Sequence, residues 1–139
     1  MRKNILPAYA AALLLSVSGA AMALPMYTIT DLGDLQGGGS ETQAFGINDY
    51  GQVVGYSQAT TGGRAFLWQD GVMTDIGTLP GYNLRSTARG INNSGQVIGY
   101  SQGTTGVHGF LWDSGNGMMD LGDLPGGADE SFAWAPPPI

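Results

Sequence analysis

The feature that most constrains this chain is an internal repeat with a spacing of 44 residues. Residues 46–68 align without gaps on residues 90–112, and 16 of these 23 positions are identical. The block DLGDL at 31–35 recurs as DIGTL at 75–79 and, after one inserted residue, as DLGDL at 120–124. A fixed period of this length is typical of stacked units that cannot bury their apolar faces alone. We therefore expect repeat 1 at about 31–74, repeat 2 at about 75–119, part of a third repeat at about 120–134 and a Pro-rich tail at 135–139.

The sequence pattern of each repeat predicts four short antiparallel strands. In repeat 1 these are residues 44–48, 52–57, 64–68 and 72–76. Residues 48–51 place Asn first and Gly fourth, as a type I turn prefers. Asp70-Gly71 predicts a two-residue hairpin, because both turn positions need a positive φ angle. Gly and Pro interrupt every candidate helix after residue 23, so no amphipathic helix of useful length is expected there.

Strand alternation predicts that both faces of each sheet are covered. It places Phe66 and Trp68 on one face and Leu67 on the other, and repeat 2 has the same pattern. A sheet stacked between two others has this requirement, whereas a lone antiparallel sheet has one polar face. The expected fold class is all-β, with tandem four-stranded antiparallel units that are β-propeller-like blades. The propeller would be incomplete, since closed ones typically have about 4 to 8 blades.

Three spaced blocks of the repeat resemble a known family, the HAF-repeat extracellular proteins, named for a His-Ala-Phe tripeptide. The blocks are DLGDLQGG at 31–38, GINDYGQVVG at 46–55 and RAFLW at 64–68, and each recurs in order. The resemblance implies secretion or surface display and a β-propeller-like fold, and it implies no particular biochemical activity. This chain has Arg64-Ala65-Phe66 in one repeat and His108-Gly109-Phe110 in the next, which favours a structural role for that position.

Residues 1–23 have the pattern of a secretory signal peptide. Arg2 and Lys3 precede an apolar stretch from 5 to 17, and Ala21-Met22-Ala23 is a small-x-small cleavage pattern before Leu24. An uncleaved anchor is disfavoured, because the apolar stretch is shorter than the roughly 20 residues that a spanning helix needs. The expected localisation is secreted, periplasmic or extracellular, with no stable membrane insertion after cleavage.

The charge balance limits the partners of residues 24–139. Three arginines remain there against eleven acidic residues, which gives a net charge of −8. Nucleic acid is therefore not an expected partner, because phosphate binding needs clustered basic residues. With no cysteine in the chain, stability must come from packing and hydrogen bonds. The expected partner is an unknown protein or glycan, with possible self-association through exposed sheet edges.

The third repeat stops within its first strand. Ala133-Trp134 matches Ala44-Phe45, but Pro136-Pro137-Pro138 then replaces the Ile-Asn-containing turn, and proline cannot continue a central strand. Three explanations remain open: a truncated product of a larger propeller without function of its own, a short stack that assembles with copies of itself, and an open pair of sheets packed face to face. The first two are favoured, because about three repeats are normally needed for stability.

No residue is assigned a catalytic role, a metal or a cofactor. Residues 99–103 (GYSQG) match the nucleophile motif of serine hydrolases, but no helix follows Ser101. His108 is the single histidine and is expected to be solvent-facing at a strand start. The aspartates at 31–39 and 113–120 do not match calcium-binding loop patterns and are assigned to turns, although calcium binding is left open.

Four aromatic residues recur in register and could stack on sugars, but packing between sheets explains them better: Tyr56, Trp68, Tyr100 and Trp112. The ligand-binding residues therefore stay unknown. The sequence predicts an exported, non-enzymatic β-repeat protein that acts as a structural or binding module of the cell envelope or extracellular space. The alternatives are a non-functional fragment and a periplasmic serine hydrolase that uses Ser101.

Overall fold

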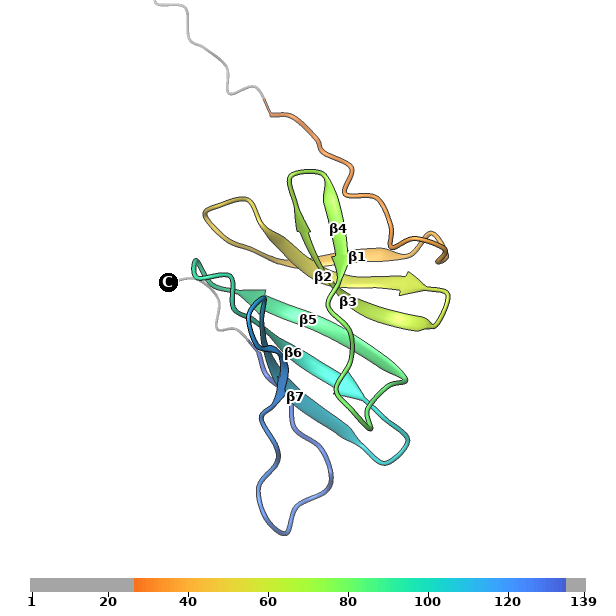
Figure 1. Cartoon of the computed structure of the whole chain (residues 1–139), viewed down its shortest axis with the longest axis vertical. Coiled ribbons are helices and arrows are strands. Elements are labelled where there is room, and N and C mark those ends of the chain that lie inside the picture. The colour runs from red at the N-terminus through yellow and green to blue at the C-terminus, as the bar shows by residue number, and fades with distance from the viewer. Residues whose placement is uncertain (1–26, 135–139) are drawn as a thin grey trace, which may run out of the picture.

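The computed structural model describes residues 27–134, and all of their regular structure is β (Figure 1). The predicted signal peptide and the Pro-rich tail at 135–139 lie outside the described residues. Eight strands follow one another along the chain: β1 (Thr42–Ile47), β2 (Val53–Ala59), β3 (Gly62–Gln69), β4 (Val72–Asp75), β5 (Arg85–Ile91), β6 (Val97–Gln102), β7 (Val107–Asp113) and β8 (Gly117–Asp120). The all-β prediction is confirmed.

The strands form two antiparallel meanders, in the orders β1-β2-β3-β4 and β5-β6-β7-β8. Their registers are equivalent: Thr42 pairs with Ser57 as Ser86 pairs with Ser101. Each first strand also has a register shift at the same repeat position, between Ala44 and Gly46 in β1. The prediction of two equivalent four-stranded units is confirmed, and the strands β2 and β3 extend further than expected because Ala59 pairs with Gly62.

The local turn chemistry explains where the strands reverse. Asp70 and Gly71 have φ angles of 51° and 85°, so the β3–β4 hairpin has the two positive values that the sequence predicted. At the β1–β2 turn the Oδ1 atom of Asn48 accepts hydrogen bonds from the amides of Tyr50 and Gln52, at 3.1 and 3.0 Å. Asn92 makes the same two bonds in the second unit. An Asn side chain therefore fixes this turn in both sheets.

The two sheets pack together with β5, the edge strand of the second sheet, lying against β1, β2 and β3 of the first (Figure 1). Between them lies a core that contains Val54 and Ala65 from the first sheet and Val97 and Phe110 from the second. Phe66 and Trp68 lie in a separate cluster on the other face of the first sheet, and Leu67 packs on the inter-sheet core. The alternation predicted from the sequence is confirmed. Residues 27–134 form no closed or propeller arrangement.

The contact between the sheets joins residues that are equivalent in the two repeats. The Nδ2 atom of Asn48 donates to the carbonyl of Asn92 at 3.0 Å, and the amide of Asp49 donates to Oδ1 of Asn93 at 3.1 Å. Asn93 donates back to the Asp49 carboxylate at 2.7 Å. Each unit thus stacks on the next by pairing position i with position i+44. Such a contact is head-to-tail, because the two surfaces that meet are different.

Candidate functional site

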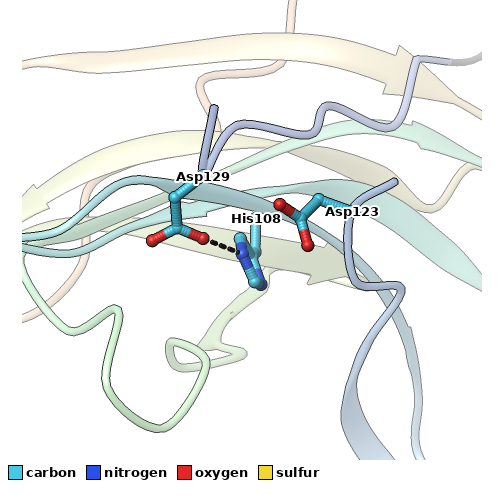
Figure 2. Close-up of side chains that lie close together, drawn as sticks. All are labelled: His108, Asp123 and Asp129. Atoms are coloured by element: carbon cyan, nitrogen blue, oxygen red, sulfur yellow. Dashed lines mark hydrogen bonds and ion pairs between the residues drawn. The ribbon is translucent and has the colours of Figure 1, made fainter. Parts of the chain in front are cut away.

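Within residues 27–134, a cluster of ionisable groups surrounds His108 at the start of β7. Its Nδ1 atom lies 2.9 Å from the Asp120 carboxylate at the end of β8. Its Nε2 atom lies 2.6 Å from the Asp129 carboxylate (Figure 2). The Tyr82 hydroxyl is 2.9 Å from Nε2, and its ring stacks on the imidazole with centroids 4.2 Å apart. Asp123 faces the same imidazole (Figure 2). His108 therefore joins the second sheet to the residues that follow it.

The prediction that His108 faces solvent is wrong, because the residue is only 8% exposed. One carboxylate comes from Asp120, the last residue of β8, and the other from Asp129, which the chain brings back over β7 after that strand. Sequence reasoning missed this site because Asp120 was assigned to a turn, while Asp123 and Asp129 were given no role. The signal available was the repeat comparison, in which Arg64, Thr78 and Leu84 occupy the positions of His108, Asp123 and Asp129.

The cluster favours a protonated imidazole. Hydrogen bonding to Asp120 raises the pKa of His108 above its ordinary value of 6.5, and Asp129 adds to this effect. The hydrogen bond from His108 in turn holds the pKa of Asp129 below 3.8. With both ring nitrogens protonated, each donates to a carboxylate. The arrangement is a charge-assisted clamp between β7 and the residues after β8.

The same groups could also hold a cation if the imidazole were neutral. Ligand atoms of His108, Asp123 and Asp129 lie within 4.8 Å of one another. Asp120 would then accept from Nδ1–H and leave Nε2 as the free ligand atom, an arrangement common for metal-binding histidines. The ion-pair clamp, in contrast, uses both nitrogens without any added group.

The clamp should make stability depend on pH. The contribution of His108 is fully present below about pH 6.5 and is lost as the pH rises through its raised folded-state pKa. The contribution of Asp129 is present above about pH 3.8 and is lost as the pH falls through its lowered folded-state pKa. Thermal unfolding between about pH 5 and about pH 9 should therefore show a fall in the wild-type midpoint that His108→Gln lacks.

The matched control for this experiment is Arg64→Gln. Arg64 occupies the equivalent position in the first unit and hydrogen-bonds to backbone carbonyls of Gly63 and Thr61, at 3.0 and 2.9 Å. Its replacement should leave the pH dependence unchanged, because the partners of Arg64 are backbone carbonyls, which do not titrate. Parallel wild-type and His108→Gln curves would refute the clamp.

Ser101, the serine of the hydrolase-like motif, uses its hydroxyl group in structural hydrogen bonds. Its side chain is fully buried in β6. The Oγ atom accepts from the amide of Leu79 at 3.0 Å and donates to the carbonyl of Tyr82 at 2.6 Å. Ser57 holds Leu35 in the same way in the first unit, at 3.1 Å. Nucleophile activation requires a base within hydrogen-bond reach, and here the hydroxyl proton is donated to a carbonyl.

A column of stacked side chains runs through equivalent positions of the three repeats. The guanidinium of Arg89 lies 4.4 Å from the ring centre of Phe45 and 4.7 Å from that of Trp134. The Tyr100 ring is 5.4 Å from the same guanidinium. Phe45, Arg89 and Trp134 occupy the same repeat position, so the column continues the head-to-tail stacking into the third repeat.

An open hollow lies where the β1–β2 turn of the first sheet meets the second sheet. It has a volume of about 410 Å³. The residues that line it include two aromatics, Tyr50 and Trp112, and three amide residues, Gln52, Gln69 and Asn93. An exposed ring with nearby amides suits the stacking and hydrogen bonding of a sugar or a peptide backbone. Of the four aromatics proposed from the sequence, Trp112 lies in this hollow.

Comparisons with known proteins provide no identification. Neither protein-family models, nor curated proteins, nor solved structures give a match to the chain. Within residues 27–134, no helix has the length and hydropathy that a membrane crossing requires. The role of the chain must therefore be argued from its own geometry.

Proposed function

We propose that this protein is an exported, non-enzymatic β-repeat protein of the HAF-repeat type, which acts as a structural or binding module of the cell envelope or extracellular space. Its sheets would serve as blades that stack with further blades into a propeller-like assembly. Export is supported by the signal-peptide pattern of residues 1–23. Fractionation of the producing cells should then recover the protein outside the cytoplasm.

The observation that carries the proposal is that the polar residues shared by the repeats are used for stacking. Asn48 and Asn92 fix equivalent turns, and Asn48 also bonds to the neighbouring unit. Ser57 and Ser101 each hold the leucine of a DLGDL-type block. A repeated motif whose polar groups are bonded within the stack supports a scaffold better than a catalyst.

The sharpest test compares Ser101→Ala with the wild type. The buried amide of Leu79 would lose its acceptor, so we expect a loss of about 1–3 kcal/mol in the free energy of unfolding by urea. Ser57→Ala is the matched variant and should behave similarly, because the same bond holds Leu35. In a generic esterase assay neither wild type nor variant should hydrolyse the substrate. A wild-type activity that Ser101→Ala abolishes would establish the hydrolase alternative.

The hollow between the units supports glycan or peptide binding as a second aspect of this role. Tyr50 is largely exposed at its rim. The side-chain amides of Gln52 and Asn93 each use one N–H to bond to Gln69 and Asp49, which leaves the second N–H of each as a donor. A binding module on a rigid stack would present such a hollow at each junction between units. This supports the expected protein or glycan partner.

A further inference from the structure

Residues 120–134, the C-terminal segment, are a second copy of residues 31–45, the N-terminal segment. The two read DLGDLPGGADESFAW and DLGDLQGGGSETQAF, and 9 of their 15 positions are identical. The N-terminal segment covers one face of the first sheet and supplies the beginning of β1. The C-terminal segment has no β2 of its own to pair with in residues 27–134. Within the described part of the chain, the N-terminal copy of this segment is thus paired with a following strand and the C-terminal copy is not.

The C-terminal segment is held on the second sheet as the linking segment 75–89 is held on the first. The amide of Gly109 donates to Ser131 Oγ at 2.9 Å, and the amide of Ala65 donates to Ser86 Oγ at the same distance. The Leu121 amide likewise donates to the carbonyl of Gly109 at 3.0 Å. In the linking segment this docking is followed by pairing with the next sheet. Within residues 27–134, the C-terminal segment is docked on the sheet before it but is not paired with a sheet after it.

Its apolar residues are exposed where their equivalents are buried. Leu124 is 85% exposed, whereas Leu79 is 1% exposed because it inserts beside Ser101 of the next sheet. Leu121 is 53% exposed, whereas the equivalent Ile76 is 7% exposed. Burial of such side chains is favourable in proportion to the apolar area removed from water. These residues are therefore suited to a sheet like the one that follows the linking segment.

We propose that the C-terminal segment of one copy replaces the N-terminal segment of a second copy and becomes the first strand of that copy's first sheet. Leu124 would then occupy the place of Leu35 beside Ser57, and Ser131 would occupy the place of Thr42. The two chains would be joined as the first and second sheets are joined within one chain. The proposal rests on the proposed role as a stacking module and names its partner as a second copy.

The energetics favour exchange over simple addition. The place beside Ser57 is already filled by Leu35, so a second leucine can enter only if the N-terminal segment leaves. Because the two segments are so similar, the C-terminal segment can form nearly the same backbone hydrogen bonds to β2 as the N-terminal segment that it replaces. The bonds that the C-terminal segment now makes to Val107 would be exchanged for pairing with β2. Burial of Leu121 and Leu124 offsets the exposure of Leu32 and Leu35 in the departing segment. The gain in apolar burial therefore comes from Trp134, whose ring is larger than that of the departing Phe45.

The Arg89 column supports the same register. Trp134 is 60% exposed and is in contact with the guanidinium of its own chain on one side. In the exchanged form it would take the place of Phe45, over which Arg89 of the second copy lies. Trp134 would then lie between two guanidinium groups, one from each chain. Repetition of this contact gives a ring if the rotation closes and a filament if it does not.

The test uses cysteines at positions that meet only after exchange. The chain contains no cysteine, so Ser57→Cys and Ser131→Cys each introduce one. Thr42 Oγ1 lies 2.9 Å from Ser57 Oγ, and Ser131 would take the place of Thr42. Mixing the two full-length variants under thiol–disulfide exchange should therefore give a mixed disulfide. Ser57→Cys mixed with Ser114→Cys, an exposed loop position, is the control and should not.

A second variant keeps the test independent of any effect of Ser57→Cys on folding. Leu124→Asp changes a side chain that is largely exposed in the single chain, so its circular dichroism should match the wild type. Its self-association, measured as solution mass against concentration, should be at least about tenfold weaker than that of the wild type. The exchange would be overturned if the wild type stayed a monomer and the mixed Ser57→Cys and Ser131→Cys variants gave no mixed disulfide. This result would leave the non-enzymatic role intact, which the esterase assay tests separately.

Discussion

Replacement of Phe110 by alanine is expected to lower the free energy of unfolding by about 3–5 kcal/mol. Phe110 is fully buried in the core between the two sheets, where it packs with Val54 and Ala65 of the first sheet. Its loss leaves a cavity at the interface that joins the units, in addition to the lost burial of the ring. The measurement is urea unfolding followed by circular dichroism.

The control for Phe110 is Phe132→Ala. Phe132 is an aromatic residue of the C-terminal segment, is 48% exposed and touches the edge of Tyr100. Its removal should cost less than about 1.5 kcal/mol, because much of its surface is already in water. Equal losses of stability in the two variants would contradict this packing of the sheets.

Gly99→Ala is expected to have an effect of similar size for a different reason. A Cβ atom at this position would overlap the carbonyl oxygen of Thr87 and would lie 2.9 Å from both the Ala88 Cα and the Phe110 ring. Neither the paired backbone of β5 nor a fully buried ring can move aside at low cost. We expect a loss of about 3 kcal/mol or more, and the same for Gly55→Ala in the first unit.

A glycine in an open loop provides the comparison. At Gly115 the nearest atom to an added Cβ is a carboxylate oxygen of Asp113, at 3.4 Å. Gly115→Ala should change the free energy of unfolding by less than about 0.5 kcal/mol. If Gly99→Ala were as well tolerated as Gly115→Ala, the close approach of β5 and β6 at this position would be wrong.

The strands and their faces could be predicted from the sequence because they depend on local chemistry. Asp70-Gly71 and the Asn48 turn specify reversals within a few residues, and period-2 alternation separates Phe66 from Leu67. The repeat further indicated that two such units exist. Closure into a propeller could not be predicted in the same way, because it depends on how successive sheets rotate against one another.

The His108 site could not be predicted from spacing alone. Asp129 lies 21 residues after His108, and only the path of the chain back over β7 brings the two together. The first repeat has Arg64 where the second has His108, and this difference between the repeats suggested an exposed position. The repeat comparison contained the missing information, since only the second unit has the imidazole and its carboxylates together.

The fold depends on head-to-tail stacking of the repeats, in which the residues of the Asn48 turn meet their equivalents in the next unit. Nuclear Overhauser contacts in solution test this most directly. We predict contacts between the amide proton of Asp49 and the side chain of Asn93, whose Oδ1 lies 3.1 Å from the Asp49 nitrogen. Intact turns at both positions with no contact between them would show that the two sheets form but do not stack in this register.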